Sequence, residues 1–407
     1  MLIVKLAFKN LFRNTRRTLL TLSAMSSATF LLMITLAIND GFLWSMILSS
    51  TDYFHAHIKI TSLKYENKKE IHHTISDQID PLFSKSKSIK AISARLSSNL
   101  LFSHQSQNKS YSTPAQLLGI QPKLESKITK LHTSLIQGSY LKNNNDIVLG
   151  KILAKTLKAT IGDEIIVMGQ GAYGSIASGL FKVSGIISTS NPMRDSRLAL
   201  AHIKSVQDIL GLENQAHYYS AVIHDVLSAK EISKSLQTLS KKYYIQSWRN
   251  ILEQTSQALD FWIIGQIIIL CIFYFAVILI CVNTMTMSIM ERKYEFASLR
   301  AIGLKKSMIL KMISLEGMAL SSLSALIGGF IGVSISFFLH SNPISLSFFS
   351  GTISWGETSF QPIIRAYPTY FNMLTPIIVM SLLGVLTTIY PTIKILSTPL
   401  NKLMGDR

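Results

Sequence analysis

One short motif in this chain has the spacing of a dinucleotide-binding loop. Gly169, Gly171 and Gly174 match G-x-G-x-x-G after a predicted strand, and Asp195 follows about 20 residues later, as in nucleotide-binding folds. That chemistry needs a helix directly after the third glycine, because the pyrophosphate binds at the helix N-terminus. Residues 175–179 instead stay rich in Gly and Ser and lead into another predicted strand. The context therefore favours a hairpin loop over a nucleotide site.

Histidines are the other candidates for chemistry. His55 and His57 would lie on one face of a strand, and His72 and His73 are adjacent, but a metal site needs a third ligand that the sequence does not locate. We interpret them as surface or interface residues and predict no metal site. Residues 150–151 (Gly-Lys) lack the upstream glycine and the following hydroxyl residue of a P-loop. Since catalytic motifs such as H-E-x-x-H and G-x-S-x-G do not occur either, we predict a non-catalytic chain without a cofactor.

Composition narrows the class of protein. The chain has 407 residues, of which 48% are hydrophobic and 15% charged, and its net charge is +18. This hydrophobicity excludes a disordered chain, and two cysteines, Cys271 and Cys281, are too few for a disulfide-built secreted scaffold. A hydrophobic and basic chain is either a nucleic-acid binder or a membrane protein. The distribution of charge along the chain decides between these two classes.

Four stretches lack charged residues, and each is long enough for a bilayer core, which about 20 helical residues cross. We therefore predict four transmembrane helices and no nucleic-acid binding, with the spans at residues 18–39, 261–290, 320–339 and 374–393. Acidic residues occur only at the edges of the spans, at Asp40, Asp260 and Glu316. This argues against an ion pump or a proton-coupled carrier, because such proteins need carboxylates near the midplane.

Basic residues set the predicted orientation. Lysines and arginines precede span one, fill the loop between spans two and three, and follow span four. The positive-inside rule places both termini and that loop in the cytoplasm. Residues 1–44 are then a basic amphipathic helix with span one, and residues 258–407 hold spans two to four. Residues 45–257 form a large extracytoplasmic domain inserted between helices one and two, of ordinary domain size.

This outer domain mixes strand and helix signals, which indicates an α+β domain rather than a regular doubly wound sheet. Apolar runs and alternation predict strands at residues 55–62, 91–104, 111–119, 164–168, 181–189 and 218–224. Helices are expected at residues 71–89 (broken near Pro81), 147–159, 205–210 and 229–239. Prolines and glycines break residues 341–370, which we expect to form an outer loop at the membrane surface.

The loop between spans two and three carries the strongest functional signal. Residues 291–306 predict a charged amphipathic helix, with Glu291 and Glu295 on one face and Gly303 as its cap. A second helix, at residues 307–315, would lead into span three through Glu316. The alternative is a solvated charged turn, but such an amphipathic helix would be unusual in a mere turn.

Span three also carries a stripe of small residues at spacings of three and four. Small side chains let membrane helices approach closely. We predict a helix–helix contact, within the chain or across a dimer, at Ala325, Gly328, Gly329, Gly332 and Ser336.

These patterns together resemble a known family. Residues 291–303, ERKYEFASLRAIG, resemble the E-R-x-x-E-[IF]-x-x-L-R-A-[IL]-G pattern of FtsX/MacB-like (type VII) ABC transporter permeases. Other parts of that family are matched, in the same order, by LAFKNLFRNTRRTLLTLSA, VLGKILAKTLKATIGDEIIV, GLFKVSGIIST and YPTIKILSTPLNKLM. The segments most similar to its lipoprotein-releasing, LolC/LolE-like branch are HAHIKI and GQGAYGSIASGLFKV.

The resemblance implies an inner-membrane dimer, with a second copy or a paralogue, and two cytoplasmic ABC ATPase subunits on separate chains that would hold ATP and Mg²⁺. ATP-driven motion would pass through rigid spans to the outer domain, which is mechanotransmission. The helix that docks on the ATPase in this family falls on Glu291, Arg292, Glu295, Leu299, Arg300, Ala301 and Gly303.

The substrate follows from the branch that the chain resembles. Release of lipoproteins from the inner membrane is the first expectation, with membrane lipid and a lipoprotein or periplasmic partner as contacts. Export of a peptide or another amphiphile with a periplasmic adaptor, as by MacB-like proteins, is one alternative. An FtsX-like signalling scaffold that activates a cell-wall hydrolase is another.

Overall fold

The chain divides into two compact units. The computed structural model describes residues 15–106, 108–189, 191–345, 353–355, 358–360 and 363–398, so most of the basic helix predicted at residues 1–16 lies outside the described residues. Residues 1–44, 261–345 and 363–407 form the helical unit, and residues 45–260 and 346–362 form the mixed unit. In sequence, most of the mixed unit thus falls between the first two long helices.

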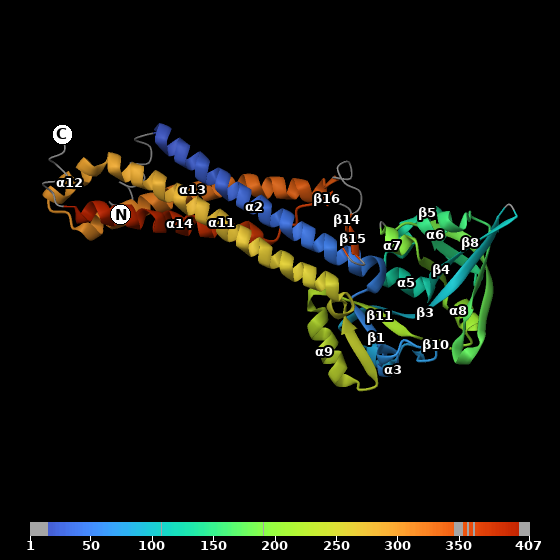
Figure 1. The fold of residues 1–407 in the computed structure, drawn as a ribbon. Coiled ribbons are helices and arrows are strands. Elements are labelled where there is room, and N and C mark those ends of the chain that lie inside the picture. Colours follow the sequence, from blue (N-terminus) through green and yellow to red (C-terminus); the bar gives the residue numbers. More distant parts are fainter. Residues whose placement is uncertain are drawn as a thin grey trace. The chain divides into compact units, whose positions relative to one another are not determined.

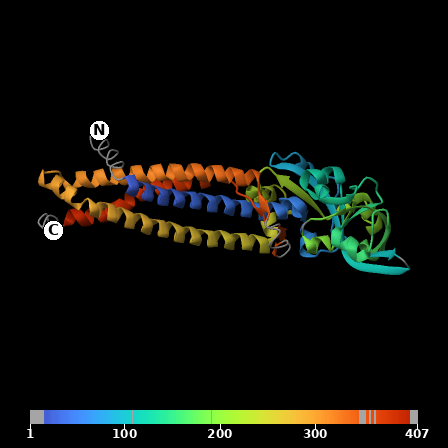
Figure 2. The same cartoon turned by 90° about the horizontal axis from the view of Figure 1, so that it is seen from above.

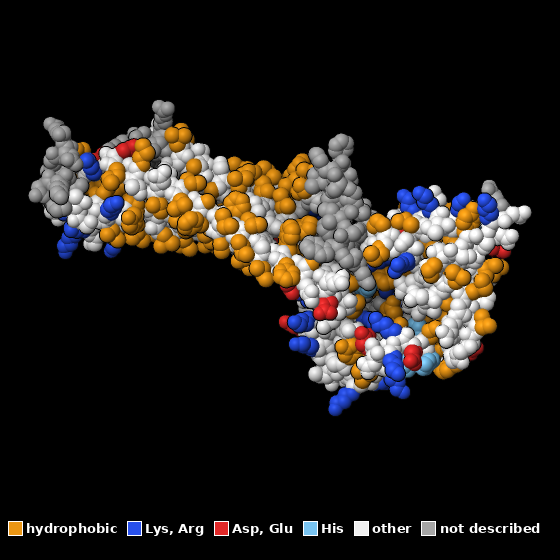
Figure 3. Space-filling view, viewed as in Figure 1, with side chains coloured by type: hydrophobic (Ala, Val, Ile, Leu, Met, Phe, Trp, Pro, Cys, Tyr) orange, Lys and Arg blue, Asp and Glu red, His pale blue; other side chains and the backbone are white. Residues whose placement is uncertain are grey.

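Four long helices run side by side in the helical unit (Figures 1 and 2). They are α2 (Thr15–Ser50), α11 (Glu253–Glu291), α13 (Lys306–Ser341) and α14 (Tyr370–Ser397), and the short α12 (Lys293–Ala301) separates α11 from α13. All four are long and apolar enough to cross a membrane. Hydrophobic side chains cover most of their visible surface (Figure 3). The prediction of four long apolar helices is confirmed.

Glycines set the closest approach between α13 and α2. A Cβ on Gly328 would overlap the carbonyl oxygen of Ser26, and one on Gly332 would lie 2.8 Å from the sulfur of Met33. The Ser26 hydroxyl also donates to the carbonyl oxygen of Ser324, at 3.0 Å. The structure therefore places this part of the small-residue stripe against α2 of the same chain. The stripe residues Ala325 and Ser336 are buried as well.

A second close approach joins α13 to α14. A Cβ on Gly329 would lie 2.7 Å from Cδ1 of Ile377, and one on Gly317 would overlap the Thr388 methyl group. Gly317 is thus an interior position of α13, which runs unbroken from Lys306 to Ser341. The expectation of a separate helix at residues 307–315 is wrong, because this glycine serves packing and not a helix break.

The mixed unit is built on a ten-stranded sheet of order β12-β1-β11-β3-β4-β9-β6-β8-β5, with β7 paired to β3 and β8. The β4–β9 and β6–β8 pairs are parallel and the other pairs antiparallel. The strands are β1 (Ile58–Ser62), β3 (Ile89–Ser106), β4 (Lys109–Ile120), β5 (Leu135–Gly138), β6 (Asp146–Gly150), β7 (Glu164–Gln170), β8 (Ile176–Ile187), β9 (Leu198–His202), β11 (Tyr218–Ile223) and β12 (Tyr243–Ser247).

Short helices surround this sheet. They are η1 (Thr51–His55), α3 (Leu63–Asn67), α4 (Pro81–Ser84), α5 (Pro122–Ile128), η2 (Leu131–Ser134), α6 (Lys151–Leu157), η3 (Ala172–Gly174), α7 (Pro192–Asp195), α8 (Ile203–Leu210), η4 (Val226–Ser228), α9 (Ala229–Leu239) and α10 (Trp248–Ile251). The remaining strands are β2 (Ile75–Ser76), β10 (Gln215–Ala216), β13 (Ile344–Ser345), β14 (Ile353–Trp355), β15 (Thr358–Phe360) and β16 (Ile363–Ile364).

Two helix predictions in this unit are wrong. Residues 71–88 contain only the short elements β2 and α4, and residue 89 begins β3. Residues 147–159 begin in the buried strand β6 before α6 starts. An apolar run of a few residues does not distinguish a buried strand from a helix, and the β6 run Ile147–Leu149 is fully buried. The glycine motif at residues 169–174 forms the turn between β7 and β8, so the hairpin prediction is confirmed.

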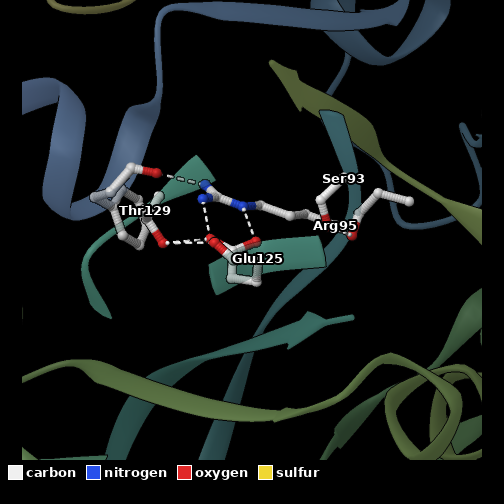
Figure 4. A network of polar contacts seen from close by, with 6 residues as sticks. Ser93, Arg95, Glu125 and Thr129 are labelled. Carbon is white, nitrogen blue, oxygen red and sulfur yellow. Dashed lines mark hydrogen bonds and ion pairs between the residues drawn. The ribbon is translucent and has the colours of Figure 1, made fainter. Parts of the chain in front are cut away.

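A buried ion pair connects η1 to the sheet (Figure 4). Arg95 of β3 donates from Nε and Nη2 to the Glu125 carboxylate, while the Thr129 hydroxyl donates to the same carboxylate at 2.7 Å. Nη1 of Arg95 donates to the carbonyl oxygen of Phe54. Because a buried arginine must be both paired and hydrogen-bonded, this network fixes the position of Phe54 in the mixed unit.

We expect Gly328→Ala to destabilise the helical unit by about 1–3 kcal/mol, because the added methyl group would overlap the α2 backbone. Gly265→Ala is the matched control, since a Cβ at Gly265 of α11 meets no atom within 4 Å. Denaturant unfolding in detergent micelles measures both variants. Equal stability of the two would contradict close packing of α13 on α2.

Candidate functional site

The helix breaks at Arg292, in the segment between α11 and α13. Helix α11 ends at Glu291, and Arg292 leaves helical geometry with φ −101° and ψ 13°. Helix α12 then begins at Lys293. Glu291 and Glu295 therefore belong to different helices, and the prediction that they share one helix face is wrong. The expected single helix over residues 291–306 is also shorter, since α12 ends at Ala301.

The end of α12 is formed by a glycine cap. Gly303 has φ +101°, a conformation that glycine adopts without strain. Its N–H donates to the carbonyl oxygen of Arg300 at 3.1 Å, and the N–H of Leu304 donates to that of Leu299 at 3.1 Å. This is the Schellman arrangement, which satisfies the last carbonyl groups of a helix. The prediction that Gly303 caps the helix is confirmed.

An apolar cluster holds α12 against all three neighbouring helices. Phe296 and Ala297 are the residues that α12 contributes, and both are buried. Around them the cluster contains Ile289 of α11, Ile309, Met312 and Ile313 of α13, and Ile395 and Leu396 of α14. Leu299 packs on its edge. One face of α12 is thus part of the core of the helical unit.

A largely buried ion pair reinforces this docking. Arg292 Nη1 donates to both carboxylate oxygens of Glu316 in α13, each at 2.8 Å, and Nε donates to Glu295 at 3.1 Å. The side chains of Arg292 and Glu316 are only 12% and 11% exposed. The guanidinium also lies 5.2 Å from the Phe296 ring. Arg292 therefore connects the break after α11, the first turn of α12, and α13.

A second polar contact ties α12 to the end of α14. Arg300 Nη1 donates to the carbonyl oxygen of Thr398, the residue after α14, at 3.0 Å. The contact satisfies a carbonyl group at a helix C-terminus, where a cation is favourable. Arg300 is half-buried in this position.

The opposite face of α12 and the turn after it are open to solvent. Ile302, in the turn directly after α12, is 78% exposed. Tyr294 is also exposed. The other exposed residues of this surface are Glu291, Ser298, Ala301, Gly303, Lys305 and Lys306. An apolar and aromatic centre with lysines beside it suits contact with a protein partner.

The seven residues predicted for coupling divide between these two faces. Glu291, Ala301 and Gly303 lie on the exposed surface, whereas Arg292 and Leu299 face the core and Glu295 and Arg300 are half-buried. Sequence reasoning missed Ile302 and Tyr294, and it treated Glu316 only as a span-edge residue. The only sequence signal for the role of Glu316 was its position near the start of span three, where a carboxylate is costly without a partner.

The histidines do not form the predicted arrangement. His55 ends η1, and His57 precedes β1, where its Nδ1 accepts from the N–H of Ile223 at 3.2 Å. The expectation that they share a strand face is therefore wrong. Nε2 of His72 and of His73 lie 3.2 and 3.7 Å from the same Glu70 oxygen, in an exposed cluster.

Two family models match successive parts of the chain. The MacB-like periplasmic core domain matches residues 18–239, and the FtsX-like permease C-terminal domain matches residues 267–400. The chain belongs to the FtsX/MacB-like family of ABC transporter permeases. It is accordingly a multi-pass membrane protein of a family whose members are transporter subunits, and α12 lies inside the FtsX-like part of the permease.

Curated relatives of this permease are distant. It is 22% identical over 228 residues to the lipoprotein-releasing system transmembrane protein LolC of Neisseria meningitidis, covering 54% of this chain and 55% of LolC. It is 22% identical over 212 residues to the uncharacterized ABC transporter permease protein Rv0987 of Mycobacterium tuberculosis, covering 51% of this chain and 23% of that protein. The permease thus matches about half the length of the first relative and about a quarter of the second.

Solved extracytoplasmic regions also match. The periplasmic region of MacB from Actinobacillus actinomycetemcomitans is 17% identical with a TM-score of 0.33, covering 48% of this chain and 90% of that one. The extracellular domain of YknZ, a transporter from Gram-positive bacteria, is 12% identical with a TM-score of 0.32, covering 47% and 98%.

Removing one partner of the Arg292–Glu316 pair should destabilise the permease by about 3–5 kcal/mol, because the other charge stays buried without compensation. We therefore expect a large loss of stability in Arg292→Leu and in Glu316→Leu. The double variant should recover much of it, since two apolar side chains replace both charges. Denaturant unfolding in micelles measures all three, with Lys305→Leu as an exposed control. Additive losses in the double variant would contradict a buried pair.

Proposed function

We propose that this permease passes motion from a separate ATPase to its mixed unit, with the ATPase docked on the exposed face of α12. The observation that carries the proposal is the division of α12 into two faces. Phe296 and Arg292 fix the inner face to the other helices, while Ile302 lies open beside Tyr294. A load applied to the outer face would reach α11, α13 and α14 together.

The proposed orientation puts α12 and both termini in the cytoplasm and the mixed unit outside it, in the inner membrane. The lysines and arginines before span one, between spans two and three, and after span four support this orientation. ATP and Mg²⁺ would then be held by the partner ATPase, and the permease itself would be non-catalytic. The sequence given contains no G-x-x-x-x-G-K-[ST] motif, which supports a separate ATPase.

A second permease copy, or a paralogue, and membrane lipid are further proposed contacts. Helix α11 offers the surface for these contacts. Only 6% of its most apolar stretch is buried, against 33–39% in α2, α13 and α14. Its exposed residues include Ile264, Ile268, Ile272 and Phe275. A surface so apolar and so little covered requires either lipid or another helix.

For the substrate we propose lipoproteins, which this permease would help to release from the inner membrane. The match to LolC supports this choice, and the sequence segments HAHIKI and GQGAYGSIASGLFKV agree with it. Motion of the mixed unit would supply the work of extraction. The alternatives remain a MacB-like exporter of peptides or amphiphiles and an FtsX-like activator of a cell-wall hydrolase.

Docking on α12 can be tested by photo-crosslinking in the native host. We expect a benzoyl-phenylalanine at Ile302 to crosslink to a protein that carries a P-loop, identified by mass spectrometry. The same group at Phe338, an exposed residue near the other end of α13, is the control and should give no such product. Crosslinks from Phe338 alone, or none to a P-loop protein from Ile302, would overturn the docking proposal.

The lipoprotein proposal has a separate readout. Cells depleted of the permease and labelled with radioactive palmitate should accumulate lipoproteins in the inner membrane, because their release would stop. Fractionation of the two membranes measures the distribution, and re-expression of the unchanged chain should restore it. An unchanged distribution would exclude lipoprotein release while leaving ATPase docking intact.

A further inference from the structure

A tight turn in the mixed unit gathers two histidines and a glutamate at one point. Nε2 of His72 lies 3.2 Å from Oε2 of Glu70, and Nε2 of His73 lies 3.7 Å from the same oxygen. The ligand atoms that these three residues offer all lie within 4.8 Å of one another. The sequence did not locate a third ligand for the two histidines, and the folded turn brings Glu70 to them. We refer to the three residues as the His–Glu cluster.

The backbone explains why these side chains meet. The N–H of His73 donates to the carbonyl oxygen of Glu70 at 3.1 Å, which closes a β-turn with Glu70 as its first residue and His73 as its last. The first and last residues of such a turn have Cα atoms less than about 7 Å apart, so their side chains can reach the same ion. Directly after the turn the chain enters β2, which pairs with β10.

The middle of the turn is fixed by His217, whose side chain is buried. Its Nδ1 accepts from the N–H of Ser97 at 3.1 Å, so Nε2 carries the proton and donates to the carbonyl oxygen of Ile71 at 2.9 Å. The Tyr65 ring stacks on His217 with ring centres 4.7 Å apart. The turn is therefore held in place before any ligand binds, which reduces the entropy lost on binding.

A backbone carbonyl group orients the ring of His73. Nδ1 of His73 lies 3.0 Å from the carbonyl oxygen of Lys68, and because a carbonyl oxygen only accepts, Nδ1 carries the proton. In the neutral ring the lone pair is then on Nε2, the nitrogen that faces Glu70. Histidines that bind metal ions usually donate from the other ring nitrogen in this way. The His72 ring is positioned beside Tyr173 of η3, with ring centres 5.7 Å apart.

The spacing of the three ligand atoms fits a tetrahedral zinc ion. Zinc binds imidazole nitrogen and carboxylate oxygen at about 2.0–2.2 Å, so neighbouring ligand atoms of a tetrahedral site lie about 3.3–3.6 Å apart. The distances of 3.2 and 3.7 Å in the His–Glu cluster bracket this range. Two imidazoles and one carboxylate also suit a divalent transition metal, whereas calcium and magnesium prefer oxygen ligands alone.

From this geometry we propose that Glu70, His72 and His73 bind one divalent transition-metal ion, with Zn²⁺ as the best match and water in the remaining tetrahedral position. The side chains of Glu70 and His72 are 47% and 41% exposed, so the ion is accessible from solvent and can exchange. All three ligands come from a single turn, and the ion therefore does not join distant parts of the sheet. The site is independent of ATPase docking at α12 and of the substrate, so it stands or fails separately from the proposed function.

Metal binding can be measured by titration calorimetry on the full chain in nanodiscs, purified without a polyhistidine tag and stripped with EDTA. We expect one Zn²⁺ ion per chain, and no displacement by a large excess of Mg²⁺ or Ca²⁺. Co²⁺ should bind in its place and give the strong visible absorption of a four-coordinate ion. Displacement by Mg²⁺ or Ca²⁺, or only the weak absorption of six-coordinate Co²⁺, would overturn the proposed coordination.

Single variants locate the ion. His72→Ala, His73→Ala and Glu70→Gln should each weaken Zn²⁺ binding at least about tenfold, since even the loss of a group that only supports a metal ligand costs that much. Glu70→Gln keeps the shape of the side chain and removes its charge, so it tests the ligand without disturbing the turn. The matched control is His224→Ala, which removes an exposed histidine elsewhere in the mixed unit and should leave the affinity unchanged. Unchanged affinity in the three variants, or an equal loss in the control, would show an exposed ion pair and overturn the metal site.

Discussion

Arg292 and Glu316 form an ion pair from which solvent is largely excluded, at the point where α11 gives way to α12. Two charges so placed are costly when separated, because each would keep its desolvation penalty without a partner. The pair therefore resists any motion that moves α12 away from α13. The apolar cluster around Phe296 adds a contact with α11 and α14. Together they make the short helix part of the helical unit rather than a loose connection.

Close helix packing extends this constraint along the unit. Gly328 and Gly332 bring α13 against α2, and Gly317 and Gly329 bring it against α14. Interfaces built on glycine leave little room for one helix to slide past another, because any side chain there would meet backbone or a neighbouring side chain. Helix α11 is different, since most of its apolar surface is uncovered. The helical unit thus combines a packed set of three helices with one that is available to lipid or a partner helix.

The sequence predicts those features that depend on local rules. Long charge-free runs identify the four spans, and Gly303 predicts the end of α12, because a Schellman cap needs only its own few residues. The break at Arg292 has no such local cause, since the residues around it all tolerate a helix. It forms where the guanidinium can reach Glu316, which lies 24 residues further along the chain. A contact of that kind is visible only in the folded structure.

The same distinction explains the mixed unit. The strand β6 and the helix α6 follow one another directly, and the pairing of β6 with β8 and β9 sets where the strand lies. A cavity of about 490 Å³ in the mixed unit was equally hidden from sequence analysis, because its lining residues Phe54, Gln116 and Arg194 come from η1, β4 and α7. No spacing in the sequence relates them, whereas the sheet order and the Arg95 network bring them to one wall.

The two faces of α12 bear on how the family pattern should be interpreted. Of the residues that carry the resemblance, Arg292, Leu299 and Arg300 make contacts within the helical unit, and Gly303 ends the helix. Such a pattern specifies how the helix is held and oriented, and any partner that binds it must then recognise what the fold leaves exposed. On this chain that surface is centred on Ile302, at a position where the pattern allows only Ile or Leu, and on Tyr294, at a position that the pattern leaves open. The pattern therefore combines residues that hold the helix in the bundle with an aliphatic side chain that the fold leaves exposed, while Tyr294 is the part of this surface that the pattern does not specify.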